Sequence, residues 1–303
     1  MPREVRNVGA SVRARLLARA RAEKTDYQIL LTRYALERLL YRLSVSVHRD
    51  RFILKGALLF VTWLDDPFRP TRDLDLLGYG ANNGEAMTDA FRAICSTAVP
   101  DDGVTLDLDG LTAAAIREDL EYGGVRVQTY AVIDGARIPI QVDIGFGDII
   151  TPGPVELVYP VLLDSPAPHL RAYPVETVVA EKLHAIVMLG IANSRLKDFY
   201  DLWLISRAFE LDGVALSAAV QRTFERRQTL IPTDVPTGLT RYYAEEWDAR
   251  WKVFLKREHM SAAPDNLGQV LDDLRRFLVP LMTPTDTTAY WRSGGPWSNR
   301  TRT

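Results

Sequence analysis

The stretch FILKGALLFVTWLDDPFRPTRDLDLL, residues 52–77, decides the fold. An apolar run ends at Lys55 and Gly56, and the segment closes on a D-x-D pair, Asp73 and Asp75. Side chains alternate between the faces of an extended strand, so both aspartates lie on one face. Two adjacent carboxylates repel each other, and such hard oxygen ligands suit Mg²⁺, which relieves that repulsion. The alternative for an isolated D-x-D is a solvated strand end.

A second extended segment, RIPIQVDIG at residues 137–145, alternates apolar and other side chains with a period of two. That period predicts a strand, with Asp143 late on its polar face. If the two strands are neighbours, three carboxylates converge, because Asp143 then joins Asp73 and Asp75. Such a group of hard oxygen ligands favours a site for a divalent cation.

Two later segments complete the pattern: AEKLHA, which contains Lys182, and RLKDFYDL, which contains Asp198. The order K-G, T-x-D-x-D, V-D-I, E-K-L and R-x-K-D-x-x-D resembles the AbiEii/AbiGii toxin family, nucleotidyltransferases of the DNA polymerase β superfamily. The matched motifs cover roughly half of the chain, and the order is far more specific than any one motif.

The resemblance implies an α/β fold: a polymerase β-like mixed sheet with a helical N-terminus and a large helical C-terminal region. It implies transfer of a nucleoside monophosphate from an NTP to a hydroxyl, with pyrophosphate released. Asp73, Asp75 and Asp143 then hold Mg²⁺ or Mn²⁺, and Asp143 favours deprotonation of the acceptor. Lys182 neutralises the triphosphate, and Asp198 is a further active-site residue that orients Lys182 or attracts the metal.

The nucleotide is expected to meet Lys55, Gly56 and Thr71 as well. Polymerase β-like enzymes usually carry Gly-Gly or Gly-Ser where this chain has Gly56-Ala57. The serine hydroxyl is therefore absent, and Thr71, Lys55 or backbone N–H groups must compensate.

Other readings of these residues are open at the level of sequence. Lys182 is a surface lysine in the simplest reading, and Asp198 favours the dipole at a helix start. Asp201 is expected to secure structure by pairing with Arg195 or Lys197. Arg69 and Arg72 either contact phosphates or balance the nearby aspartates.

Composition narrows the classes of protein further. The single cysteine, Cys95, excludes an intramolecular disulfide and a Cys-rich zinc site, and is expected to be a small core residue. No apolar run approaches the ~18 residues of a membrane span, so a cytoplasmic protein without membrane contact is expected.

The net charge of −2 conceals an uneven distribution. Residues 1–55 carry 13 Lys and Arg against 5 Asp and Glu, a local balance of +8. A basic end indicates either contact with a polyanion or a solvated surface. Four aromatic residues of the C-terminal half either stack on unpaired bases or lie in the core: Tyr242, Tyr243, Trp247 and Trp251.

The pattern of elements predicts three regions: a basic helical N-terminus at 1–50, a nucleotidyltransferase core at 51–165 and a helical domain at 166–303. The tail from residue 283 is expected to be loose or docked. The resemblance further implies a cognate antitoxin and an RNA acceptor, with the 3′ end of tRNA favoured. A protein or small-molecule acceptor is the alternative enzyme reading, and a non-catalytic RNA- or antitoxin-binding module is the alternative of another class. The base of the NTP and the oligomeric state are not encoded in any motif.

Overall fold

The structure is a computed structural model that describes residues 7–64, 71–116, 123–282 and 289–299. Arg69 therefore lies outside the described residues. The chain forms two compact units. The first contains Met1–Gly147 and Val155–Ala172, and the second contains Asp148–Pro154 and Tyr173–Thr303.

The first unit is built on a mixed sheet that includes both predicted aspartate-bearing strands. The order of the described strands is β3-β5-β6-β2-β1-β8-β7, with β4 also pairing with β5. Strand β2 runs parallel to β6 and antiparallel to β1, while β1 runs parallel to β8. The strands are β1 (Phe52–Lys55), β2 (Asp73–Gly78), β3 (Thr105–Leu106), β4 (Thr112–Ile116), β5 (Gly124–Ile133), β6 (Ala136–Phe146), β7 (Val155–Val158) and β8 (His169–Ala172).

Strands β5 and β6 form a long hairpin because their sequences alternate strictly. The connecting residues Asp134 and Gly135 both have positive φ, 45° and 79°. An Asp-Gly pair of this kind is the preferred two-residue hairpin turn. The alternation buries every second residue of β6, including Val142 and Ile144, and leaves Asp143 on the opposite face.

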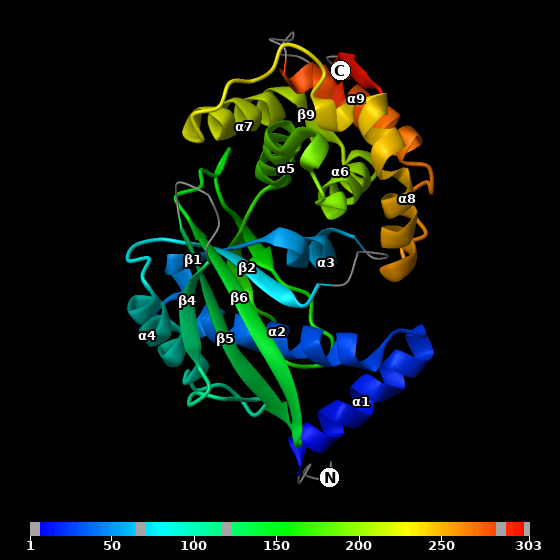
Figure 1. The fold of residues 1–303 in the computed structure, drawn as a ribbon. Helices are drawn as coiled ribbons and strands as arrows, with labels where there is room; N and C mark the ends of the chain where they lie inside the picture. Colours follow the sequence, from blue (N-terminus) through cyan, green and yellow to red (C-terminus); the bar gives the residue numbers. More distant parts are fainter. Residues whose placement is uncertain (1–6, 65–70, 117–122, 283–288, 300–303) are drawn as a thin grey trace. The chain divides into compact units, whose positions relative to one another are not determined.

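Helices cover the sheet on the face that carries these apolar residues. They are α1 (Val8–Glu23), α2 (Tyr27–Val45) and α4 (Gly84–Cys95), and α2 and α4 pack together behind the sheet in Figure 1. A 3-10 helix, η2 (Gly56–Leu59), and the short helix α3 (Phe60–Trp63) follow β1. Cys95 closes α4 and is half-buried, and burial raises the pKa of its thiol to about 12.

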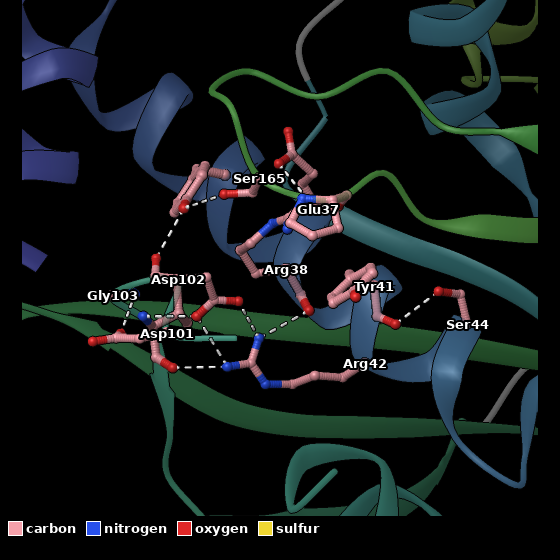
Figure 2. Close-up of polar contacts among 12 residues, drawn as sticks. Glu37, Arg38, Tyr41, Arg42, Ser44, Asp101, Asp102, Gly103 and Ser165 are labelled. Carbon is pink, nitrogen blue, oxygen red and sulfur yellow. Dashed lines mark hydrogen bonds and ion pairs between the residues drawn. The ribbon is translucent and has the colours of Figure 1, made fainter. Parts of the chain in front are cut away.

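Helix α2 carries charged side chains into the interior of the first unit. Glu37 and Arg38 are fully buried, with Arg38 Nη2 2.7 Å from Glu37 Oε1 and 3.0 Å from the carbonyl oxygen of Pro166. One turn later, Arg42 donates two hydrogen bonds to the Asp102 carboxylate, at 2.7 and 3.1 Å (Figure 2). These two arginines fasten neighbouring loops to α2, so their charges are used within the fold.

The second unit is helical, as the sequence predicts. Its core is aromatic, with Phe199, Tyr200 and Trp251 almost fully buried. Its helices are α5 (Val175–Leu189), α6 (Leu196–Ala208), α7 (Gly213–Arg226), α8 (Arg241–Arg257) and α9 (Leu267–Met282).

The described part of the tail is docked. Strand β10 (Ala289–Trp291) pairs with β11 (Trp297–Asn299) and with β9 (Leu211–Asp212) in a small antiparallel sheet. The Trp291 ring lies 4.8 Å from that of Phe277, and its indole N–H donates to the carbonyl oxygen of Ser206 at 2.7 Å. The mixed sheet, the helical N-terminus and the helical C-terminal region together confirm the predicted fold class. Of the helices described, none is long and apolar enough to cross a membrane.

Candidate active site

Four charged residues form a row across the first unit's sheet. Lys55 on β1 stands opposite Asp75 on β2, Asp75 opposite Asp143 on β6, and Asp143 opposite Arg126 on β5. Residues directly opposite in neighbouring strands share a face and have adjacent side chains. Two carboxylates in the middle are thus flanked by a cation on each side.

Asp73 begins a second row on the same face, because it lies two residues before Asp75. It stands opposite Gln141 on β6. The Thr71 hydroxyl donates to the carbonyl oxygen of Asp73 at 3.2 Å, so Thr71 here supports the strand start. The alternation places Asp73, Asp75 and Asp143 on one face of two adjacent strands, as the sequence predicts.

Gly56 lies against the carboxylate of Asp75. Its φ is +74°, and a Cβ placed on it would come 2.1 Å from Asp75 Oδ2. Glycine is needed here for two reasons, the left-handed backbone and the space that the carboxylate occupies. The predicted role of Gly56 beside the acidic pair therefore has a steric basis.

Arg126 holds the third carboxylate. Its Nε and Nη2 atoms each lie 2.8 Å from one oxygen of Asp143. The amide of Gln141, with its oxygen turned to accept, adds contacts of 3.3 Å to the same two nitrogens. Sequence reasoning missed Arg126, although its position was visible in the alternation of β5, where Val125 and Val127 are buried on either side of it.

The side chains of the acidic row are of the kind that binds a divalent cation. Among the described residues they are not arranged around a single position. Nowhere in the described ranges do three His, Cys, Asp or Glu side chains stand in metal-binding geometry. The carboxylates of Asp73 and Asp75 are hard oxygen ligands of the kind that Mg²⁺ and Mn²⁺ prefer. Asp143 lies opposite Asp75 and accepts from Arg126 at both of its oxygens.

In the second unit, Lys182 is held by two carboxylates. Lys182 Nζ lies 2.6 Å from Asp198 Oδ1 and 2.9 Å from Asp201 Oδ2. The expected pairing of Asp198 with Lys182 is present. The expectation that Asp201 pairs with Arg195 or Lys197 is wrong, because the buried face of α6 turns both aspartates toward α5 and leaves those two cations exposed.

A second polar cluster lies around Arg227, another residue that the motifs did not single out. Arg227 Nη2 donates to Asp148 at 3.0 Å and lies 3.6 Å from Glu181, while Nη1 lies 3.2 Å from His184 Nδ1. Burial, followed by the charge of Arg227, lowers the pKa of His184 to about 4. His184 is therefore neutral at physiological pH, and its Nε2–H donates to Thr229 Oγ1 at 3.1 Å.

A known protein family matches most of the chain. Residues 38–277 match the family model described as the nucleotidyl transferase AbiEii toxin of type IV toxin–antitoxin systems. No curated protein matches the chain. Two crystal structures from Helicobacter pylori are similar in fold. The JHP933 protein is 12% identical with a TM-score of 0.45, and the match covers 84% of this chain and 94% of that one. A nucleotidyltransferase candidate is 14% identical with a TM-score of 0.46, over 84% of this chain and 98% of that one.

The family match spans well over half of the 303 residues and includes every predicted site residue. The chain belongs to the AbiEii nucleotidyl transferase toxin family of type IV toxin–antitoxin systems.

Proposed function

We propose that the protein transfers a nucleoside monophosphate from an NTP to a hydroxyl of RNA, with the 3′ end of tRNA as the acceptor. The single observation that carries the proposal is the register of Asp75 with Asp143 across β2 and β6, with Asp73 on the same face. A blocked 3′ end cannot be aminoacylated, which gives a toxin its effect on translation. The cytoplasm, which holds both NTP and tRNA, is the proposed place of action, and a cognate antitoxin is the proposed protein partner.

In the proposed reaction, each charged residue on this face of the sheet has its own role. The acceptor oxygen attacks the α-phosphorus, the bond from that phosphorus to the pyrophosphate oxygen breaks, and the hydroxyl proton leaves toward Asp143. Asp73 and Asp75 would hold a Mg²⁺ or Mn²⁺ ion, which would supply positive charge to the phosphoryl oxygens. Lys55, which stands opposite Asp75, offers a cation to the phosphates beside the carboxylates.

Lys182 is the proposed contact for the triphosphate. Asp198 and Asp201 hold its ammonium group from two sides, and its side chain retains 15% exposure. Asp198 is then a positioning residue that acts through Lys182. Gly56 and Thr71 keep the strand ends around the carboxylates in place.

The test uses α-labelled NTPs, Mg²⁺ and total RNA. Asp73→Ala and Asp75→Ala should each abolish labelling, whereas Asp89→Ala, an exposed residue of α4, should label like the parent protein. Because a carboxylate removed from a repulsive pair should not unfold a strand, all three variants should melt normally. Labelling near the parent level in both site variants would exclude metal binding at the pair. Label found on protein or on a small molecule, and none on RNA, would replace the RNA acceptor with that class.

The toxin activity has its own test. Expression should arrest growth, and the Asp73→Ala variant should be harmless. Arrest that persists in the variant would point to a non-catalytic mechanism such as sequestration of RNA.

A further inference from the structure

The second unit has a groove that the active-site residues do not use. It has a volume of about 570 Å³ and lies between the beginning of α6 and the outer face of α8. Four of its lining residues are cations, Arg195, Lys197, Arg250 and Arg257, and none is an acid. A hollow lined by a single sign of charge focuses the field and attracts the opposite charge.

The cations of the groove are available to a ligand. Arg195, Lys197 and Arg250 are exposed, and none of the three has a carboxylate within ion-pair distance among the described residues. Arg257 pairs with its neighbour Glu258 at 2.8 Å, yet its side chain keeps 71% exposure. The lining of the groove therefore presents a net positive charge to a ligand.

The same groove contains a fixed aromatic ring. Trp247 donates its indole N–H to the carbonyl oxygen of Ile191 at 3.0 Å and stacks on Tyr243, with ring centroids 5.7 Å apart and 15° between the planes. The guanidinium carbon of Arg250 lies 4.5 Å from the ring centroid. Val253, 66% exposed, adds an apolar surface beside them. Tyr243 and Arg250 both lie against this ring, so a base stacks on it only when the Arg250 guanidinium turns from the ring toward a phosphate.

The basic N-terminus, by contrast, uses much of its charge internally. Arg13 contacts Asp134, Arg15 contacts Asp164, and Arg38 and Arg42 are buried against carboxylates as described above. The excess of positive charge in residues 1–55 is thus a poorer guide to a polyanion site than the smaller cluster in the groove.

We propose that the groove of α6 and α8 binds a single-stranded segment of RNA. The four cations contact phosphates, and Trp247 and Val253 contact a base. This combination of a positive groove with an aromatic platform is the mode by which proteins hold unpaired nucleic acid. An acidic protein segment would pair with the cations but would leave Trp247 and Val253 without a contact. The proposal rests on the proposed function, because it assigns the RNA contact of that reaction.

Binding is measured by fluorescence anisotropy of a labelled single-stranded oligoribonucleotide, in EDTA and without NTP, so that catalysis plays no part. The groove variant is Arg250→Glu with Arg257→Glu. The matched control is Lys252→Glu with Lys256→Glu, which makes the same charge change on the same helix outside the groove. If both groove arginines contact phosphates, the slope of log affinity against log salt should become shallower by about 1.4, at about 0.7 per phosphate. The control should keep the parent slope.

Trp247→Ala should lower the affinity by about 10-fold with the salt slope unchanged, because stacking is not an ionic contact. Trp247→Phe retains a ring and should recover part of that loss. Thermal unfolding shows whether each variant is folded. Equal RNA binding by the groove variant and the control would overturn the proposal, and so would a groove variant that loses only the antitoxin.

The two proposals fail in different ways. Transfer to RNA by a groove variant that also binds RNA normally would refute the groove and leave the reaction intact. RNA binding that depends on the groove, in a protein that labels no RNA, would support the groove and refute the reaction.

Discussion

Arg126 and Asp143 face each other as a cross-strand pair on β5 and β6, joined by two hydrogen bonds of 2.8 Å. The guanidinium occupies both oxygens of the carboxylate that the proposed reaction assigns to the acceptor and the ion. We expect Arg126 to weaken the attraction of this carboxylate for a divalent cation, because the guanidinium already neutralises its charge.

Replacing Arg126 by Gln should tighten Mn²⁺ binding by roughly 3- to 5-fold, because a half-exposed ion pair contributes about 1 kcal/mol or less. Calorimetric titration of Mn²⁺ into nucleotide-free protein measures the effect. Arg137→Gln, which removes another partly exposed sheet arginine that pairs with Asp107, is the control and should bind Mn²⁺ like the parent. Weaker binding in the Arg126 variant would make the arginine a support for the site instead of a competitor.

Gly56→Ala should abolish transfer and destabilise the protein, because the new methyl group collides with the Asp75 carboxylate. Gly80→Ala separates the two causes of that loss. Gly80 has a similar φ of +83°, yet a Cβ there meets nothing within 4 Å. Gly80→Ala should therefore cost only the backbone term, about 1 kcal/mol of unfolding free energy, and keep its activity. Equal losses in the two variants, measured by denaturant unfolding and by NTP transfer, would remove the steric role of Gly56.

Lys182→Ala should lower both stability and NTP use. The substitution leaves two buried carboxylates without their shared cation, which typically costs about 3 to 5 kcal/mol. Adding Asp201→Asn removes one of those charges and should recover stability without restoring NTP use. The KM for NTP should rise in both variants while RNA affinity stays constant. An unchanged KM would restrict Lys182 to a structural role.

Acid should destabilise the second unit through His184. Its pKa is lowered to about 4 in the folded state, whereas an unfolded histidine titrates near 6.5. Between these values the unfolded chain binds the extra proton, so stability falls as the pH falls through this window, by roughly 1 to 3 kcal/mol. The cause is local: the ring is buried, and a proton on Nδ1 would also point at the guanidinium of Arg227.

Unfolding free energies measured from pH 7 to pH 4 test this expectation. His184→Gln has no group to titrate and should show a flatter profile, while His169→Gln, an exposed residue, should reproduce the parent. A parent profile that is flat across this range would contradict the lowered pKa.

Local patterns predicted much of this molecule because they depend on neighbouring residues alone. Strict alternation located the strand expected at residues 137–145 to within one residue of each end of β6. The shared face of Asp73 and Asp75 follows from the period of a strand, so it too was predictable.

What the sequence did not reveal depends on contacts between distant segments. Strand β8 is only four residues long, and it is a strand because it pairs with β7 along its length and with β1 at Ala172. The clamp by Arg126 requires the register of a hairpin, and the true partner of Asp201 requires the rotation of α6 against α5. The aromatic residues of α8 lie in different environments for the same reason. Tyr243 and Trp251 are buried, whereas Trp247 lines the groove.

The two units interleave along the chain, since residues 148–154 belong to the second and 155–172 return to the first. The edge of β1 that receives β8 is therefore open until residues 169–172 have been synthesised. An unpaired strand edge is a template for pairing with other chains. The nascent chain thus completes the strands that carry the aspartates before β8 can pair with β1. A chain cut anywhere between β6 and β8 would keep the aspartates and expose a surface prone to aggregation.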